Sequence, residues 1–220
     1  MKRILIIHAH PEKQSFCSAL KEAAVAHFQS KGCDVKVSNL YSMGFNPVGD
    51  KNDFLELSNP AFFKYQAEQT NAFQHDLFTP EVKAEMEKFL WCDTLIFTFP
   101  LWWFGLPAIL KGWVDRVFAM GFAYGAGKGV YDNGAFKEKV AFLVTTTGGP
   151  EVAYGENGKN GNLETILFPI HHGMLYFVGM QVKAPFICFS PARLTDEQRK
   201  AELDRFEIYL QSVDKGPSIY

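Results

Sequence analysis

Short apolar runs alternate with amphipathic stretches along this chain. Five of the runs show no helical spacing and are typical of strands that are buried on both faces. These runs are Arg3–His8, Val35–Val37, Thr94–Phe99, Val140–Thr145 and Val182–Phe189.

Helix signals lie between the runs. Apolar residues at steps of four from Phe16 predict a helix that Ser15 caps and Gly32 ends. A second helix is predicted to begin after Thr79, whose hydroxyl would act as its cap.

Two more helices complete the pattern. One is predicted over Pro107–Phe118, and the last starts at Thr195, where Gln198 completes a capping box. Buried strands that alternate with amphipathic helices predict a parallel, doubly wound sheet in an α/β fold. Five strands fit the flavodoxin-like order, with three α/β/α layers and a single domain over residues 1–220.

One long segment, Ser42–Phe78, has no clean periodicity and is rich in Asn, Gln and aromatic residues. It is too long for a simple connection between two elements. We therefore expect an irregular functional loop or an arm that reaches a partner subunit.

Charge and cysteine content exclude several classes of protein. The net charge is −2 with both signs interleaved, which argues against nucleic-acid binding. The 4 cysteines form no CxxC pair, so free thiols in a reducing compartment are expected. The first apolar run stops at His8, too early for a signal peptide or a membrane span. These features predict a cytoplasmic protein without membrane insertion.

The pair His171-His172 raises the question of a metal site. Adjacent residues on a helix point about 100° apart, and no Cys or acid at ligand spacing accompanies this pair. We expect no metal and place both histidines at the surface or an interface.

Ligands of doubly wound sheets bind beyond the carboxyl ends of the strands. After the first run, the chain passes His10 and reaches a helix start at Ser15-Phe16. A helix N-terminus favours phosphate, to which Ser15 would add a hydroxyl and His10 a ring donor. Neither GxxxxGK[ST] nor GxGxxG is present. Taken alone, Ser15 could equally be a simple cap.

An aromatic turn follows the third run, in the sequence Pro100-Leu-Trp-Trp-Phe-Gly-Leu-Pro107. Three adjacent aromatic side chains in a turn cannot all point into a core. They predict packing against a planar ligand, and an interface patch is the alternative.

A third loop follows the fourth run and ends in Gly148-Gly149. Paired glycines let the backbone approach a ligand and direct its N–H groups at negative charge, although a plain turn would use them equally well. Together the three loops predict a phosphate site, an aromatic platform and a cluster of N–H donors at one sheet edge. A flavin needs this combination.

Several stretches carry a family resemblance. On them, the chain resembles the NAD(P)H:quinone oxidoreductases, also called DT-diaphorases. The matching stretches are His10–Ala24, Leu40–Pro47, Phe99–Gly112, Phe122–Tyr124, Thr146–Gly149 and Phe168–Val182, of which Pro100–Trp113 is a specific signature.

The resemblance implies a set of cofactor-binding residues for FAD, with FMN as the alternative. They are His10, Ser15, Phe16, Cys17, Leu101, Trp102, Trp103, Phe104, Thr146, Thr147, Gly148, Gly149, Tyr154, Asp196 and Arg199. It also implies that Trp103, Phe104, Tyr124 and the Phe177 of a second subunit in a homodimer form the substrate slot.

Catalytic roles are implied for Gly149, Tyr154 and Asn160. The family has His where this chain has Asn160, and an amide cannot take up a proton near neutral pH. The family's two gating tyrosines are reduced here to Tyr124, which precedes a loop with three glycines.

The implied activity is two-electron, hydride reduction of quinones or similar flat acceptors with NADH or NADPH, by a ping-pong mechanism. An electron carrier for protein partners is disfavoured by the absence of a strongly acidic composition. A redox-sensing regulatory subunit with the same fold remains an alternative.

Overall fold

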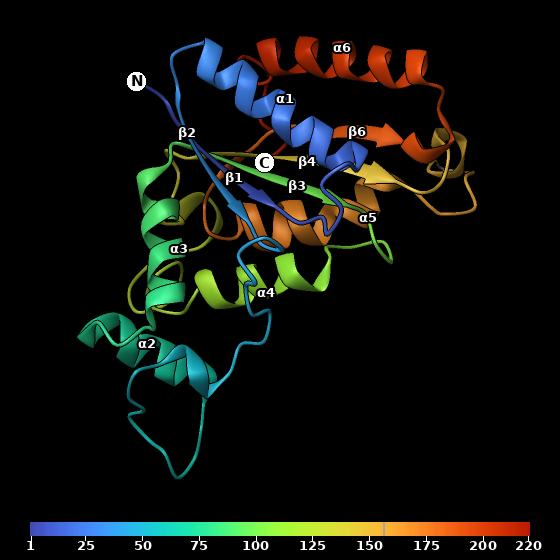
Figure 1. The fold of residues 1–220 in the computed structure, drawn as a ribbon. Coiled ribbons are helices and arrows are strands. Elements are labelled where there is room, and N and C mark those ends of the chain that lie inside the picture. Colours follow the sequence, from blue (N-terminus) through green and yellow to red (C-terminus); the bar gives the residue numbers. More distant parts are fainter. Residues whose placement is uncertain (156) are drawn as a thin grey trace.

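A computed structural model describes residues 1–155 and 157–220, and a parallel sheet forms its centre (Figure 1). The strand order is β2-β1-β3-β4, and both β5 and β6 pair with β4. The strands are β1 (Arg3–His8), β2 (Asp34–Asn39), β3 (Thr94–Pro100), β4 (Val140–Thr147), β5 (Gln181–Val182) and β6 (Phe186–Phe189). The predicted flavodoxin-like order and the first four predicted strands are confirmed.

The prediction of one continuous fifth strand over Val182–Phe189 is wrong. The chain breaks at residues 183–185 into β5 and β6, which pair with successive parts of β4. Pro185 has no N–H to donate to the ladder, which accounts for the break. On its outer side β5 is covered by the C-terminal residues, because Ile219 N donates to Val182 O at 2.8 Å.

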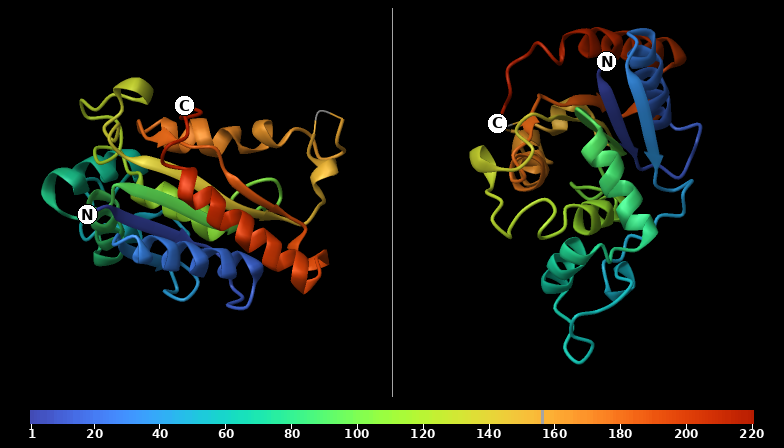
Figure 2. Two further views of the ribbon diagram at one scale, coloured as in Figure 1. Left: turned by 90° about the horizontal axis from the view of Figure 1, so that it is seen from above. Right: turned by 90° about the vertical axis from the view of Figure 1, so that its left-hand side faces the viewer.

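Helices cover both faces of the sheet. α1 (Phe16–Ser30) and α6 (Asp196–Ser212) lie side by side on one face (Figures 1 and 2). The other face carries α3 (Pro80–Trp91), α4 (Ala108–Val117) and α5 (Leu163–Ile170), which continues as a π-helix over His171–Tyr176. Two apolar cores, one on each face, hold the three layers together. None of the described helices is long and apolar enough to cross a membrane.

Side-chain caps begin two of the predicted helices. Ser15 accepts a hydrogen bond from Ser18 N at the start of α1, and Thr195 forms a complete capping box with Gln198 at the start of α6. Both predictions are confirmed. The Thr79 hydroxyl makes no capping bond to α3, so that prediction is wrong, and Pro80 at the first helical position is the start signal that remains.

The segment from Ser42 to Phe78, which we call the arm, is not wholly irregular. It contains a short 3₁₀ turn at Lys51–Asp53 and an eleven-residue helix, α2 (Tyr65–His75). Polar side chains hold α2 in place: the buried Glu68 carboxylate accepts from Ser58 N at 2.7 Å. A helix that buries glutamate lacks apolar periodicity, which explains why the sequence pattern missed it.

A buried arginine ties the arm to the body of the molecule. Arg116 of α4 is 3% exposed and donates from Nε to Asp53 of the arm at 2.8 Å. Its Nη1 donates to Glu81 of α3 and to the carbonyl oxygen of Asn46, both at 2.6 Å. Tyr65 at the start of α2 donates to the second oxygen of Asp53 at 2.5 Å. The tip of the arm extends away from the sheet (Figure 2).

Candidate active site

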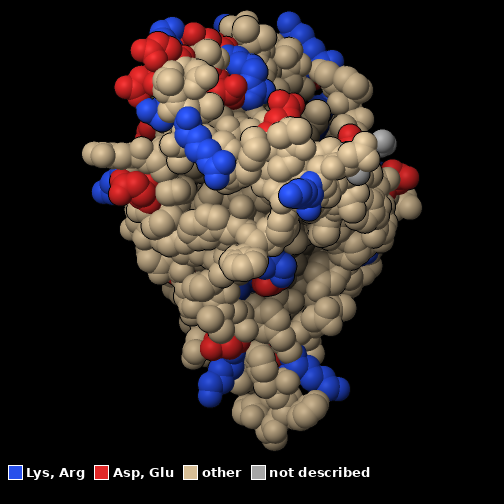
Figure 3. Space-filling model, turned by 90° about the vertical axis from the view of Figure 1, so that its right-hand side faces the viewer, with Lys and Arg blue, Asp and Glu red and all other residues tan. Residues whose placement is uncertain are grey.

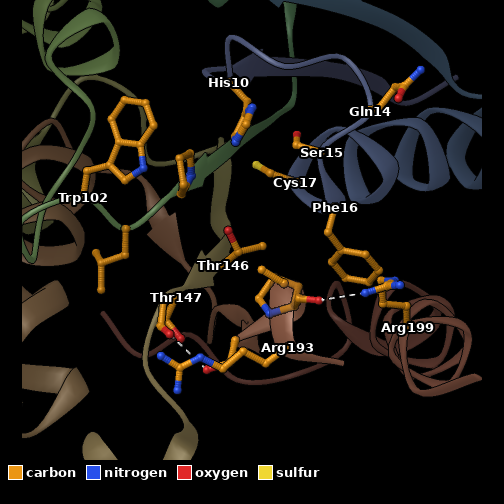
Figure 4. Close-up of a pocket in the computed structure, with 16 residues that line it drawn as sticks. His10, Gln14, Ser15, Phe16, Cys17, Trp102, Thr146, Thr147, Arg193 and Arg199 are labelled. Carbon is orange, nitrogen blue, oxygen red and sulfur yellow. Dashed lines mark hydrogen bonds between the residues drawn. The ribbon is translucent and has the colours of Figure 1, made fainter. Parts of the chain in front are cut away.

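A cavity of about 650 Å³ opens at the carboxyl edge of the sheet (Figure 4). Four loops meet there, which follow β1, β3, β4 and β6. The lining residues are His10, Gln14, Ser15, Phe16, Cys17, Pro100, Leu101, Trp102, Thr146, Thr147, Gly148, Ser190, Pro191, Ala192, Arg193 and Arg199. The cavity therefore lies where the doubly wound fold predicts a ligand.

The loop after β1 supplies hydrogen-bond donors to this cavity. The first N–H groups of a helix have no partner inside it, and Ser15 satisfies only that of Ser18, at 3.1 Å. Phe16 and Cys17 at the start of α1 line the cavity. Burial lowers the pKa of His10, and Glu12 N donates to its Nδ1 at 3.0 Å. When Nδ1 of neutral His10 accepts this bond, Nε2 carries the proton and can donate it to a ligand.

The aromatic turn after β3 has an unusual backbone. Trp102 and Gly105 exchange two backbone hydrogen bonds of 3.2 and 3.0 Å across a two-residue turn. The residues between them, Trp103 and Phe104, have φ angles of 49° and 60°. Such turns normally use Gly, Asn or Asp, because side chains strain the left-handed region. The turn stores strain while it presents two large aromatic rings.

These rings do not point into the cavity. Leu101 and Trp102 line it, whereas Trp103 is 97% exposed and Phe104 is 49% exposed. All four residues of Leu101–Phe104 were expected to contact one flat ligand. Within a single chain, only Leu101 and Trp102 reach the cavity.

The carboxyl end of β4 contributes Thr146 and Thr147 to the cavity wall, and the loop after it contributes Gly148. Beside them lie the three predicted catalytic residues. A Cβ atom on Gly149 would come within 3.0 Å of Asn160 Nδ2 and 3.1 Å of the Tyr154 ring. Gly149 is therefore needed for the close packing of Tyr154 and Asn160 next to the cavity.

The loop after β6 was not predicted from the residues themselves. Ser190 N donates to Thr147 O at 2.9 Å and its hydroxyl to Gly148 O at 3.1 Å, which fixes this loop against the loop after β4. Arg193 follows and lines the cavity. The sheet-edge rule applied to the end of the last strand would have pointed to these residues.

Arg199 also lines the cavity and is held in place by its neighbours. It donates to the carbonyl oxygens of Pro191 and Leu194 at 3.2 and 2.5 Å, and it pairs with Asp196 at 2.5 Å. Asp196 itself is not part of the lining. The predicted pair thus stands together, with only its arginine at the cavity.

The charge and the donors of the cavity suit a nucleotide with a flat ring. Among the described residues, Arg193 and Arg199 line the cavity and no Asp or Glu does. Free helix N–H groups and hydroxyls suit phosphate, and Trp102 with the loop after β4 suits an aromatic ring. The volume falls within the usual range for small-molecule sites. The donor set therefore fits a flavin nucleotide.

Two predicted substrate residues lie in a different hollow. Tyr124 and Phe177 have ring centroids 5.6 Å apart and line a cavity of about 420 Å³ with Gln66, Lys111 and Met174. Gln66 of the arm donates to the Tyr124 hydroxyl at 3.0 Å. Within one chain, this hollow and the first cavity share no lining residue.

The surface placement expected for His171 is wrong. His171 is 4% exposed, its Nε2 has no hydrogen-bond partner in the described chain, and burial lowers its pKa to about 4. It lines a separate hollow of about 440 Å³ with Leu167, Pro185 and Ile219. His172 is half-buried and stacks on Phe168 with ring centroids 4.6 Å apart.

Comparisons with known proteins agree with this geometry. The family model described as "Flavodoxin-like fold" matches residues 2–210. The chain is 42% identical over 220 residues to the ribosyldihydronicotinamide dehydrogenase [quinone] of Rattus norvegicus, covering 100% of the chain and 95% of that protein. It is also 42% identical to the NAD(P)H dehydrogenase [quinone] 1 of Cavia porcellus, covering 99% of the chain and 79% of that protein.

A solved structure is similar over the whole chain. It is a Klebsiella pneumoniae protein assigned as a quinone reductase, with a TM-score of 0.96 and 38% identity. The match covers 100% of this chain and 87% of the other.

Proposed function

This chain belongs to the flavodoxin-like family that includes the quinone dehydrogenases, and from this premise we propose that it is an NAD(P)H-dependent flavin oxidoreductase that reduces quinones or similar flat acceptors by two electrons. The observation that carries the proposal is the cavity where the start of α1, Trp102 and the loop after β4 converge. The family resemblance read from the sequence motifs is confirmed by the comparisons.

FAD is the proposed cofactor, with FMN as the alternative. The N–H groups of Phe16 and Cys17, with Ser15 and His10, would hold its phosphate. The backbone at Leu101–Trp102 and the Thr146–Gly148 loop would hold its ring. The cavity continues to Arg193 and Arg199, which leaves room for an adenosine half and favours FAD.

When bound, a flavin would supply the two-electron chemistry that links hydride donation by NAD(P)H to reduction of the acceptor. The chain's own contribution is placement and electrostatics. Tyr154 and the N–H of Gly149 would donate hydrogen bonds where negative charge develops. Asn160, packed beside both, would orient Tyr154 and donate through its amide. NAD(P)H and the quinone would occupy the same substrate slot one after the other, which gives a ping-pong mechanism. Parallel double-reciprocal plots are therefore expected.

A homodimer would complete the site. Trp103 is almost fully exposed, and Tyr124 and Phe177 lie in a separate hollow of the same chain. In the proposed dimer, the partner's Phe177 would face Trp103 and Phe104 across the substrate slot. In support, Figure 3 shows charged side chains gathered at the top of one face of the molecule, with fewer of them scattered over its middle and lower part, and interface cores are depleted of charge.

The hydride donor is open between NADH and NADPH, and a third donor has specific support. The relative from Rattus norvegicus is named for ribosyldihydronicotinamide rather than a dinucleotide. We therefore include a ribosyldihydronicotinamide among the candidate donors. Initial rates with all three donors and one soluble quinone would rank them.

A cytoplasmic location belongs to the proposal. All four cysteines, Cys17, Cys33, Cys92 and Cys188, are free in the described structure, as expected in a reducing compartment. Cell fractionation with an antibody against the protein would test it.

Cofactor identification is the first test of the function. The purified protein should be yellow and release about one FAD per chain on acid denaturation. The native protein should oxidise NADH or NADPH continuously only when a quinone is present. Release of FMN would keep the activity and remove the adenosine assignment. A protein that binds flavin without turnover would favour the regulatory alternative, and failure to bind any flavin would contradict the proposal.

A further inference from the structure

His8 is a buried polar residue that the proposed function leaves unused. It ends β1 directly before the loop that leads to Ser15, and it is 1% exposed. Its Nδ1 lies 2.7 Å from the Thr98 hydroxyl on β3, and its Nε2 lies 3.2 Å from the Ser18 hydroxyl on α1. His8 does not line the cavity.

The hydrogen-bond pattern determines where the His8 proton resides. Burial, with a smaller effect from the charge of Lys21, lowers the pKa of His8 to about 4, so the ring is neutral near pH 7. A hydroxyl has one proton, and that of Ser18 goes to Glu12 O at 2.9 Å. Ser18 must therefore accept from His8, which places the proton on Nε2. Nδ1 then accepts from Thr98.

Ser18 receives a second donor from the cavity wall. The Ser15 hydroxyl donates to Ser18 Oγ at 2.9 Å. An anion at the start of α1 would compete for this Ser15 proton. Once the Ser15 hydroxyl rotates toward the anion, Ser18 Oγ still accepts a hydrogen bond from His8. Without His8, the buried Ser18 oxygen would lose its donor, and this loss would oppose the rotation of Ser15.

We propose that His8 is a positioning residue for the cofactor phosphate, which acts through Ser18 to free the Ser15 hydroxyl for that phosphate. The proposal rests on the flavin-binding function proposed above. It requires that His8 supply an N–H to Ser18 and that Thr98 fix the ring in the corresponding tautomer. The effect is confined to ligands that carry phosphate.

Flavin titrations of protein stripped of cofactor test this role. The flavin fluorescence is followed with FAD, with FMN and with riboflavin, which lacks phosphate. His8→Leu should lower the affinity for FAD and FMN by about fivefold to tenfold, which corresponds to the loss of one hydrogen bond. The affinity for riboflavin should stay unchanged. His8→Gln, which retains an N–H donor, should recover most of the affinity. Thr98→Val should lower the affinity for the same two ligands.

His171→Leu is the matched control, because His171 is also buried and neutral but lies outside the cavity lining. It should leave the ratio of FMN to riboflavin affinity at the wild-type value. Thermal melting shows whether each variant folds. If His8→Leu does not fold, the flavin affinities of Thr98→Val test the role of His8.

Two results would overturn the inference. One is equal weakening of riboflavin and FMN, which would show a general effect on the loop. The other is unchanged FMN affinity in folded His8→Leu or Thr98→Val. Wild-type protein that binds no flavin would instead contradict the proposed function itself, so the two failures are distinguishable.

Discussion

Gly148 and Gly149 are neighbours in the chain with very different surroundings. A Cβ atom on Gly148 would meet nothing within 4 Å, whereas one on Gly149 would collide with Asn160 and Tyr154. The difference comes from the side chains of Tyr154 and Asn160, which pack over the second glycine only. Single-residue substitutions can therefore separate the backbone of this loop from the catalytic role proposed for its neighbours.

Gly149→Ala should lower kcat/KM for quinone reduction by about tenfold to a hundredfold, because the added Cβ atom would displace Tyr154 or Asn160 from its position beside the proposed flavin ring. Gly155→Ala is the control and should retain near wild-type turnover, because a Cβ atom there meets nothing within 4 Å and Gly155 does not line the cavity. Steady-state kinetics of both variants, with melting temperatures to verify folding, provide the measurement. Equal activity in the two variants would contradict the roles assigned to Tyr154 and Asn160.

At this scale the sequence predicted the cavity wall well, because strand ends and helix starts leave clear signals. His10, Ser15, Trp102 and Thr146 meet in one cavity, as expected. Arg193 was missed, since a lone arginine in a loop has no pattern of its own. The outward direction of the Trp103 side chain could not be predicted either, because bulky residues rarely adopt the left-handed backbone conformation found there.

Among the elements, the arm depends on a polar anchor rather than on an apolar face. Arg116 connects α4, α3 and the arm through Glu81, Asp53 and the Asn46 carbonyl group. The sequence pattern predicted α1, α3, α4 and α6 but missed α5 and α2, and the buried residues of α2 include Glu68 and Gln69. Contacts between distant polar residues leave no local pattern in a sequence, so this anchor could not be predicted.

Arg116→Met should lower the free energy of unfolding by about 3–5 kcal/mol, because it leaves the buried Asp53 carboxylate without its positively charged partner. It should also release the arm to proteases. Lys111→Met on the same helix removes an exposed ion pair with Asp115 and should change stability by less than about 1 kcal/mol.

Urea denaturation and limited proteolysis of the two variants measure these effects. If the two substitutions prove equally mild, Arg116 is not the anchor of the arm.

For the whole molecule, the distribution of the proposed site over two hollows is the main feature. The first cavity, with Trp102, is near Tyr154, and the second contains Tyr124 and Phe177. Two copies of the chain related by a twofold axis would give two complete sites, each built from both subunits. The sequence suggested this arrangement only through family resemblance, because periodicity and spacing within one chain carry no information on a partner.

Co-expression of Tyr154→Phe and Phe177→Ala chains tests the shared site. Each variant alone should be impaired, because it lacks one half of every site. Random pairing makes half of the dimers mixed, and each mixed dimer has one intact site, so about a quarter of wild-type turnover is expected. Turnover that stays at the level of the two parents would show that the site lies within one subunit.

Acid should destabilise the fold through its buried histidines. Burial lowers the pKa of His8 and His171 to about 4, below the value of about 6.5 in an unfolded chain. Between these values the unfolded chain binds protons that the folded chain does not. Stability is therefore full above about pH 6.5 and falls toward pH 4, by about 1.4 kcal/mol per pH unit for each histidine.

His171→Leu should remove one of these contributions. The loss of stability between about pH 7 and about pH 5 should be smaller than in the wild type by about 2 kcal/mol, as measured by urea denaturation. Parallel stability curves for the two proteins would show that His171 is not neutral in the fold.

The break between β5 and β6 has a consequence for solubility. The outer edge of a sheet can recruit strands from other molecules and so begin aggregation. Here that edge is divided into the two residues of β5 and the four residues of β6, with a proline at the break and the C-terminal residues hydrogen-bonded along the outer side of β5. An incoming strand would find no continuous row of free N–H and C=O groups there, so this side of the protein is protected against strand-by-strand growth during heating or refolding.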